Sequence, residues 1–399
     1  WWIHDYPKDI QEKYFETHER IPTEALSAPV LLKKGFAVLL ALSILTALAL
    51  AAGATDFKTG FLYAYGLWLL VDWYDCFFLD WVLFANVKRI RLPGTEHMDK
   101  AYHQKKYHVV RSVIGMALGL VPCLLCALIV AVLIAALAGA WAMFGTQLTA
   151  AMTIEKLDDH LWSMEYKGDY GFDGFLEQGG AKSDAEMGDY IASFLSHGFW
   201  KPDTSTAGGN YGCSTVTVTS PDGAALFGRN FDWEECDKML VHTIPQNGYE
   251  SIATCNLDFL GFGEDWKPDG SMGDKFMALA SVYAILDGMN EKGLCVADLM
   301  VSHEEGIDQN TDKPDITIVS GLRLLLDKAA NVEEALELLS QYDMHFSLGR
   351  AQHFSLSDAA GRSVAVEWQN GEMVVTDTPV VTNFYSHGDD GTSGSGQSY

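Results

Sequence analysis

Three long apolar stretches in the first 150 residues constrain the fold of this 399-residue chain more than any other feature. They lie at about 35–53, 62–86 and 112–144, and each is near or above the roughly 20 residues that a helix needs to cross a bilayer. The third stretch is too short for two full spans, so we predict one helix with a kink at Pro122. The first part of the chain is therefore predicted to be a membrane domain with about three transmembrane helices.

The basic residues around these stretches predict the orientation of the membrane domain. Two lysines precede the first stretch and seven Lys or Arg residues lie between the second and third, whereas the short first loop has only Lys58. Since basic loops stay in the cytoplasm, we expect residues 1–34 to be a cytoplasmic segment and 35–144 to be the transmembrane domain. Residues 145–399 are then extracytoplasmic, in a multi-pass protein of the cell membrane.

Acidic residues within the second stretch leave two interpretations open. Asp72, Asp75 and Asp80 fall on one broad side of a helix, and ionisable residues in a span usually face the interior of a bundle. A proton or ion path is one interpretation, and hydrogen bonding between helices or a position near the interface is the other. We favour the second, because neither of the other stretches carries a matching basic residue.

The seven cysteines give no spacing typical of a metal site. Cys123 and Cys126 lie in an apolar run without polar groups to support a metal ion, so we interpret them as buried apolar residues. Three histidines in the loop before the third stretch are interpreted as solvated. We therefore predict no metal and no cofactor.

The second half of the chain differs from the first in charge. Residues 1–150 carry a net charge of +1 and residues 151–399 a net charge of −27. A field of this sign repels phosphate backbones, so nucleic acid is excluded as a partner. The sequence stops in a run of Gly, Ser and polar residues without a closing element, and we expect it to be a fragment.

Beyond residue 150, strand and helix patterns alternate as in a soluble α/β domain. The predicted elements are strands at 153–169, a helix at 183–198 capped by Ser183, two helices within 316–340 divided at Asn331, and three strands within 353–383 with turns at Ala360-Gly361 and Asn370-Gly371. This order predicts sheets covered by helices.

The sequence around Cys213 carries the chemistry of the second half. Alternating Thr and Val residues follow the cysteine, and Asp222-Gly223 predicts a hairpin turn before the next strand. A two-residue turn would place Cys213 opposite Asp232. Arg229 would then need a bulge near residues 228–231 to reach the same face as the thiol.

A thiol that attacks an amide needs a base and a donor for the developing oxyanion. Four histidines leave a Cys-His pair open as the source of the base: His242, His303, His345 and His353. The other candidate is the α-amine of the cysteine itself, whose unperturbed pKa of about 7.7 suits proton transfer near neutral pH. That option requires Cys213 to become the first residue of its chain.

Four motifs in this order resemble the N-terminal nucleophile hydrolases of the choloylglycine hydrolase, penicillin V acylase and acid ceramidase group, which cleave linear amide C–N bonds. The motifs are Cys213 at a strand start, Gly228-Arg229-Asn230-Phe231-Asp232-Trp233, Asp287-Gly288-Met289-Asn290-Glu291-Lys292-Gly293-Leu294, and Val381-Thr382-Asn383. The resemblance covers roughly 153–399 and implies a four-layer αββα sandwich. The fold class is thus an α-helical membrane domain followed by an α+β Ntn-hydrolase domain. Residues 145–212 would be a linker and possible pro-segment, and 213–399 a C-terminally truncated catalytic domain.

The resemblance also implies catalytic roles. Cys213 would be the nucleophile and, through its freed amine, the base. Arg229 would favour the thiolate and Asp232 would hold the amine. Asn383 would donate to the oxyanion.

The predicted substrate site consists of Phe231, Trp233 and Met300, with Phe259 and Phe262 as further apolar residues. Bile-salt hydrolases have an asparagine where Met300 stands, so a second oxyanion donor is missing from its family position. A bile-salt substrate is therefore disfavoured. The family's arginine beyond the last motif would lie past the end of this sequence.

We therefore predict a membrane-tethered, extracytoplasmic cysteine hydrolase of N-acyl amides that forms a thioester and is activated by cleavage between Gly212 and Cys213. Its partners would be a small amide substrate and the lipid bilayer. The alternative is a membrane sensor or transport-associated protein whose outer domain binds a ligand without catalysis. A third possibility is that two separate sequences have been joined near residues 144–153.

Overall fold

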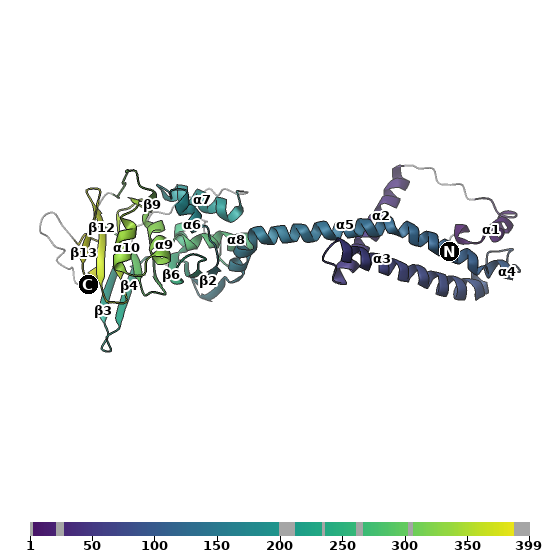
Figure 1. Ribbon diagram of the computed structural model, residues 1–399, viewed down its shortest axis with the longest axis horizontal. Helices are drawn as coiled ribbons and strands as arrows, with labels where there is room; N and C mark the ends of the chain where they lie inside the picture. Colours follow the sequence, from purple (N-terminus) through teal and green to yellow (C-terminus); the bar gives the residue numbers. More distant parts are fainter. Residues whose placement is uncertain are drawn as a thin grey trace. The chain divides into compact units, whose positions relative to one another are not determined.

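The computed structural model describes residues 3–20, 28–198, 212–233, 236–260, 266–301 and 306–386. The chain divides into two compact units, Trp1–Ala142 and Met143–Tyr399 (Figure 1). Two of the predicted site residues, His303 and Phe262, lie outside the described ranges.

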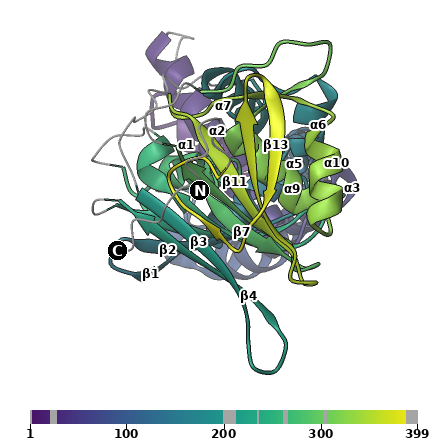
Figure 2. The same cartoon turned by 90° about the vertical axis from the view of Figure 1, so that its left-hand side faces the viewer.

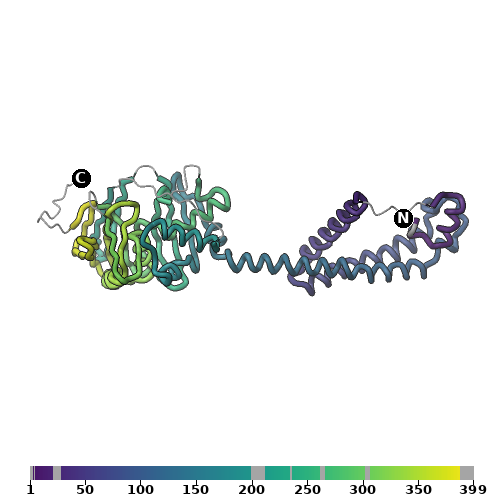
Figure 3. Tube along the Cα trace, turned by 90° about the horizontal axis from the view of Figure 1, so that it is seen from above, coloured from purple at the N-terminus to yellow at the C-terminus, as the bar shows by residue number. Residues whose placement is uncertain are grey.

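The described elements of the first unit are all helical (Figure 3). They are η1 (Ile3–Asp5), α1 (Lys8–Phe15), α2 (Ala28–Ala51), α3 (Phe57–Tyr74), the π-helix η2 (Asp75–Phe84), η3 (Lys88–Ile90), α4 (Asp99–Tyr102) and α5 (Lys105–Met152), which continues through Pro122 into the second unit. Asp56 begins α3 with a capping box, in which its side chain accepts from the Thr59 backbone N–H.

Within the described residues, two helical stretches are long and apolar enough to cross a membrane, Ala28–Ala51 and Asp99–Met152. The prediction of three such helices is therefore wrong in number. The stretch at 62–86 is helical, but it divides at Asp75 into α3 and the π-helix η2, and neither part is long and apolar enough to cross a membrane by itself. In the apolar 18-residue segment of each stretch, 11% of Ala28–Ala51 and 22% of Asp99–Met152 is buried. Most of the apolar surface of both helices is therefore exposed.

Two aspartates of the second apolar stretch, Asp72 and Asp80, contact helix α5. Asp80 Oδ2 lies 2.9 Å from Nδ1 of His108, and both side chains are largely buried. Asp72 packs against Gly115, where an added Cβ would lie 3.1 Å from Asp72 Oδ1. The basic partner of Asp80 is thus His108, four residues before the third stretch begins. The prediction that the three loop histidines are solvated is wrong for His108, which lies in α5 with 4% of its surface exposed. These contacts agree with the interpretation that the aspartates bond between helices.

The second unit contains three sheets and the helices packed on them (Figures 1 and 2). The strands are β1 (Glu155–Asp158), β2 (Leu161–Lys167), β3 (Gly212–Thr219), β4 (Ala225–Asp232), β5 (Lys238–Ile244), β6 (Ser251–Asn256), β7 (Asp287–Asn290), β8 (Cys295–Met300), β9 (Asp315–Thr317), β10 (Asp343–His345), β11 (Gln352–Ser357), β12 (Ser363–Gln369), β13 (Glu372–Asp377) and β14 (Val380–Val381). The helices are α6 (Phe172–Glu177), α7 (Asp184–Ser196), η4 (Leu257–Leu260), α8 (Met272–Ala278), η5 (Leu279–Val282), α9 (Ile318–Lys328) and α10 (Val332–Leu339).

Nine strands form the main sheet in the order β1-β2-β5-β6-β7-β8-β11-β12-β13, and β14-β3-β4 form a second sheet. Helix α9 packs on β7 and β8 from one side, while β3 packs on β8 from the other. Every residue of β11 is buried, because both faces of the central strands are covered. Figure 2 shows the β3–β4 hairpin projecting beyond the other strands of this unit.

Three of the four layers of the predicted αββα sandwich are therefore observed: helix α9, the main sheet and the β14-β3-β4 sheet. On the outer face of the second sheet, Val216 and Val218 are exposed. No helical layer covers these two residues in the described part of the chain. The fourth layer of the predicted sandwich is therefore not observed there.

Several local predictions are confirmed. The Ser183 side chain accepts from the Glu186 N–H at the start of α7, and Asn331 caps α10 in the same way. Asn370 and Gly371 both have positive φ and join β12 to β13 as a two-residue turn.

The segment before Cys213 belongs to the same core as the segment after it. Strand β2 pairs in parallel with β5 over seven residues, from Leu161 opposite Lys238 to Lys167 opposite Ile244. Trp162, Met164 and Tyr166 of β2 are buried in the main core cluster. A break at residue 212 would therefore leave the two pieces held together by a shared sheet and core.

Candidate functional site

The β3–β4 hairpin positions the predicted nucleophile, but in a different register from the one expected. Cys213 lies opposite Phe231, and Gly212 lies opposite Asp232. The reason is the turn: Ser220 and Ala224 bond to each other, so three residues form the loop, with Gly223 at φ 91°. A three-residue loop with a left-handed glycine shifts the pairing by one position relative to a two-residue turn. The predicted pairing of Cys213 with Asp232 is therefore wrong.

This register brings Arg229 to the thiol without the predicted bulge. Arg229 lies opposite Thr215, two residues from Cys213, and residues two apart share a face of a strand. Nη2 of Arg229 lies 3.6 Å from Cys213 Sγ. Asp232 belongs to the other face, where an added Cβ on Gly212 would lie 3.0 Å from Asp232 Oδ2. The carboxylate thus lies against the residue that precedes Cys213 and away from the thiol face.

Two further contacts hold the Arg229 guanidinium. Nη1 donates to Asp287 Oδ2 at 2.8 Å, and Nη2 donates to the carbonyl oxygen of Asp298 at 2.6 Å. Asp287 is itself fixed by Thr254, whose hydroxyl donates to Oδ1 at 2.6 Å. Asp287 begins the Asp-Gly-Met-Asn motif, and sequence reasoning quoted this motif without assigning the aspartate a role.

Cys213 is buried between the two sheets, with 4% of its surface exposed. Burial raises the pKa of its thiol to about 12, although the nearby Arg229 acts in the opposite direction. The Cys213 backbone N–H donates to Asn383 Oδ1 at 2.5 Å. In this uncleaved form the thiol is protonated at neutral pH, so the nucleophile needs a base before it can react.

We expect alkylation of Cys213 in the uncleaved chain to accelerate about tenfold per pH unit from pH 7 to 10, because the thiolate fraction rises in that proportion below a pKa of about 12. Timed iodoacetamide labelling followed by peptide mass spectrometry measures this rate. A plateau below pH 9 in uncleaved protein would contradict the burial argument. Chain cleaved before Cys213 provides the comparison, since its free amine supplies a base.

Asn383 links the nucleophile to the main sheet. Its Nδ2 donates to the carbonyl oxygen of Met300 at 2.7 Å, while its Oδ1 accepts from Cys213. An amide has a second N–H on Nδ2. Neither of these two contacts uses that N–H. The structure therefore brings Cys213, Arg229, Asn383 and Met300 together.

Apolar side chains surround the same cysteine. Phe259 and Met300 belong to the buried cluster of Cys213, and Phe231 and Trp233 pack against it. The Phe231 ring lies under the Arg229 guanidinium at 5.0 Å and stacks on Trp233 at 6.2 Å. The predicted substrate residues thus lie together as an apolar wall beside the thiol.

The described histidines have partners other than Cys213. His242 pairs with Glu250 and Glu165, and His345 lies between Asp308 and Asp315. Nδ1 of His353 lies 3.1 Å from Glu367 Oε1, and its Nε2 lies 2.8 Å from the Thr382 carbonyl oxygen. Among the residues that the structure describes, none of these three rings is bonded to the thiol. His303, the fourth candidate base, lies outside the described ranges.

Asp298 is a buried ionisable residue that sequence reasoning missed. Its side chain is fully buried and Oδ2 accepts from Gln352 Nε2 at 2.7 Å. Burial raises the pKa of Asp298 to about 7, partly offset by Arg229. The sequence does contain a signal for this residue, because Asp298 interrupts an otherwise apolar strand, Cys295–Met300.

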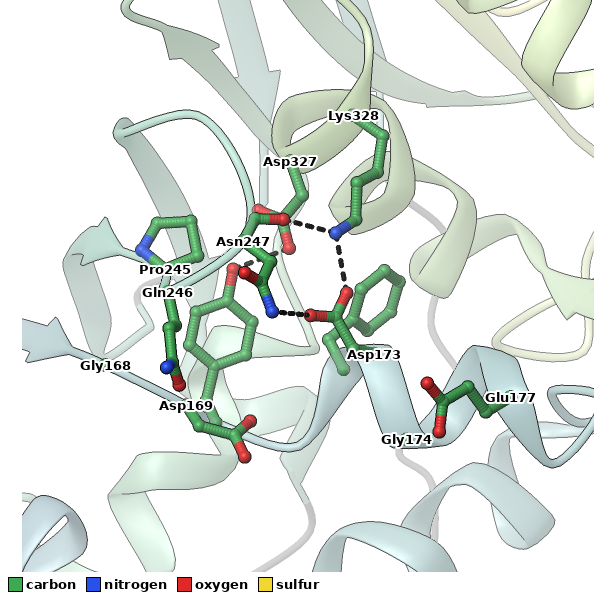
Figure 4. Close-up of a pocket in the computed structure, with 12 residues that line it drawn as sticks. Gly168, Asp169, Asp173, Gly174, Glu177, Pro245, Gln246, Asn247, Asp327 and Lys328 are labelled. Carbon is green, nitrogen blue, oxygen red and sulfur yellow. Dashed lines mark hydrogen bonds and ion pairs between the residues drawn. The ribbon is translucent and has the colours of Figure 1, made fainter.

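A separate polar pocket of about 280 Å³ lies between the start of α6, the turn after β5 and the end of α9 (Figure 4). Lys328 Nζ donates to Asp173 Oδ1 at 2.6 Å, and Tyr170 Oη donates to Asp327 Oδ2 at 2.6 Å. Asn247 Nδ2 donates to Asp173 Oδ2 at 3.2 Å. These side chains bond to one another and so join α6, the turn after β5 and α9. We therefore assign them a structural role and not a catalytic one.

Metal-binding geometry is not observed within the described ranges, where no group of three or more His, Cys, Asp or Glu side chains could hold an ion.

Comparison with known proteins connects this site to a family. Residues 213–387 match the family model of linear amide C–N hydrolases, choloylglycine hydrolase family. A bile salt hydrolase/transferase of Clostridium perfringens is 28% identical over 176 residues, 42% of this chain and 51% of that protein. A penicillin V acylase of Pectobacterium atrosepticum is 29% identical over 99 residues, 22% of this chain and 26% of that protein. The chain thus spans about half the length of the first relative and about a quarter of the second.

Solved structures similar to this chain come from the same group. A mutant conjugated bile acid hydrolase from Clostridium perfringens matches with a TM-score of 0.33 and 22% identity, over 45% of this chain and 54% of that one. Penicillin V acylase from Agrobacterium tumefaciens matches with a TM-score of 0.25 and 19% identity, over 45% and 47%.

Proposed function

We propose that this chain, whose residues 213–387 form a domain of the choloylglycine hydrolase family, is a cysteine hydrolase that cleaves linear amide C–N bonds. The observation that carries the proposal is the arrangement around Cys213. Its Sγ lies beside a guanidinium that two other residues hold in place, and its backbone N–H bonds to an asparagine that can donate to an oxyanion. This constellation lies at the start of the matched domain.

The reaction follows from the positions of these groups. Cys213 Sγ attacks the amide carbonyl carbon of the substrate, and the second N–H of Asn383 stabilises the oxyanion. Collapse expels the amine, which takes the proton that the base removed from the thiol, and leaves a thioester. Water then attacks the thioester carbon and releases the acid and the free thiol. Arg229 favours the thiolate at both stages.

We also propose that the chain activates itself by cleavage between Gly212 and Cys213. Attack of Sγ on the Gly212 carbonyl carbon transfers the acyl group from nitrogen to sulfur. The C–N bond breaks, and the thiol proton passes to the departing nitrogen, which becomes the free α-amine. Water then opens the thioester and leaves Gly212 as a carboxylate. Support comes from Asp232, whose carboxylate lies against Gly212 and can hold the new ammonium group.

Membrane tethering is the remaining part of the proposal. The apolar side chains of α2 that stay exposed include Leu32, Phe36, Val38 and Leu39, each more than 60% exposed. Such a surface is tolerated in lipid and not in water. With the orientation from the basic loops, the hydrolase unit would be extracytoplasmic. An N-acylated amphiphile then becomes the favoured substrate class, because the enzyme would work beside a bilayer.

The test is hydrolysis by the full chain in detergent, after its N-terminal ends have been sequenced. Penicillin V, a glycine-conjugated bile salt and a long-chain N-acyl glycine are the three substrates, and release of the amine is measured. We expect the N-acyl glycine to be cleaved fastest and the bile salt slowest, because Met300 replaces an amide donor. A cleaved chain that releases no amine from any of them would count against the proposed activity.

A further inference from the structure

Two fully buried ionisable side chains lie opposite each other on neighbouring strands of the main sheet, on the side that faces Cys213. His353 of β11 and Glu367 of β12 are both 0% exposed. The two residues lie one position beyond the pairing of Phe354 with Val366 in the β11–β12 ladder. Nδ1 of His353 lies 3.1 Å from Oε1 of Glu367. The same face of β11 carries Ser355, which accepts a hydrogen bond from Thr215, two residues after the nucleophile.

Both ring nitrogens of His353 face acceptors. Nε2 lies 2.8 Å from the carbonyl oxygen of Thr382, which can only accept, so Nε2 carries a hydrogen. Nδ1 faces a carboxylate that also accepts from the Ser386 backbone N–H at 2.5 Å. A hydrogen therefore also lies between Nδ1 and Glu367, where either group can carry it. In both cases Nε2 of the ring donates to Thr382 and Glu367 accepts from Ser386.

These two contacts enclose the segment that carries Asn383. His353 holds the carbonyl of Thr382, immediately before Asn383, and Glu367 holds the N–H of Ser386, three residues after it. The Asn383 side chain, fixed between these two points, bonds to Cys213 and to Met300. The pair touches neither the thiol nor the oxyanion position, so its effect on the reaction is exerted through Asn383.

We infer that His353 and Glu367 act as a positioning pair that holds Asn383 in the geometry needed to stabilise the oxyanion. This inference rests on the proposed function, because it assigns the pair a part in that reaction. The donor of an oxyanion hole must be fixed before the charge develops, and the two buried hydrogen bonds on either side of Asn383 hold the short segment that carries it. Other groups facing the pair are Asp298 from β8, Gln369 from β12 and Tyr385 from the final segment.

The kinetic test compares H353A, H353Q, N383A and the double variant H353A/N383A in the cleaved full chain, with the N-acyl glycine as substrate. We expect H353A to lower kcat roughly 10²-fold, the scale on which loss of an oxyanion donor acts, with KM little changed. H353Q should recover most of that loss, because a glutamine amide can still donate to the Thr382 carbonyl. The double variant should be no slower than N383A alone, because both changes remove the same function.

His345 provides the matched control, since it is equally buried and lies between Asp308 and Asp315, away from Asn383. H345Q should lower the thermal midpoint and leave kcat unchanged. The inference is overturned if folded H353A keeps its kcat within about threefold, or if the H353A and N383A losses multiply, as independent effects do.

A second measurement on the wild-type chain tests the hydrogen bond to Thr382 even if H353A does not fold. Nitrogen NMR of labelled histidines should show that Nε2 of His353 carries a hydrogen, with the signal assigned by its disappearance in H353Q. A ring whose Nε2 carries no hydrogen would overturn the inference. Failure of the proposed function looks different: the wild-type chain would hydrolyse nothing, while the nitrogen signature of His353 would still decide whether its ring donates to Thr382.

Discussion

Replacing Cys213 with alanine is expected to leave the chain in one piece and to lower amide hydrolysis by at least about 10⁴-fold, because the variant lacks both the nucleophile and the cleavage that frees the base. The wild-type chain should instead show a new N-terminus at Cys213. Intact mass and N-terminal sequencing measure the first effect, and amine release measures the second. The substitution removes one sulfur atom from a buried site, so the unfolding temperature should change little.

Cys295→Ala provides the control, because Cys295 lies at the opposite end of β8 from Met300. It should be cleaved and active like the wild type. The two pieces of cleaved wild-type chain should elute together in native gel filtration and separate only on denaturation, since β2 pairs with β5 across the break. Cleavage of the alanine variant at the same bond would point to a separate protease and contradict self-processing.

Replacing Arg229 with methionine is expected to produce the second large effect. The change leaves the Asp287 carboxylate without its 2.8 Å partner in a largely buried position. Breaking a buried ion pair in this way costs about 3–5 kcal/mol of stability. The thiolate also loses its nearest cation, which should reduce kcat by roughly 10²–10³-fold.

The double variant Arg229→Met/Asp287→Leu separates the two consequences. Because it removes both charges, the free energy of unfolding should return to within about 1–2 kcal/mol of the wild type. Activity should stay low, since no cation faces Cys213. Denaturant unfolding and amine release measure these outcomes on the same samples. Recovery of activity together with stability would show that Arg229 serves only the fold.

Local chemistry was largely predictable from the sequence. Ser183 and Asn331 begin helices because a short polar side chain can accept from a backbone N–H three residues later, and this needs no distant partner. Asn370-Gly371 closes a hairpin because both residues adopt positive φ readily. The grouping of Cys213, Arg229 and Asn383 was expected from motif resemblance, and the structure brings the three together.

The sequence did not determine the register of the β3–β4 hairpin. Asp222-Gly223 is compatible with loops of two or three residues, and these differ by one position in every pair along the strands. The choice placed Asp232 beside Gly212 and put Arg229 on the face of the thiol. The register depends on how the thiol face of the hairpin packs against β8, and local sequence patterns do not predict that packing.

Long-range pairs of ionisable residues are what only the tertiary structure decided. His108 meets Asp80 across two helices, Arg229 meets Asp287, and His353 meets Glu367 with Thr382 beyond it. The sequence by itself determined the caps at Ser183 and Asn331, the turn at Asn370-Gly371 and the order of the motifs, because these depend on neighbours within a few positions. A buried charge is stable only where a partner from a distant segment arrives at hydrogen-bonding distance, and that condition is met in three dimensions.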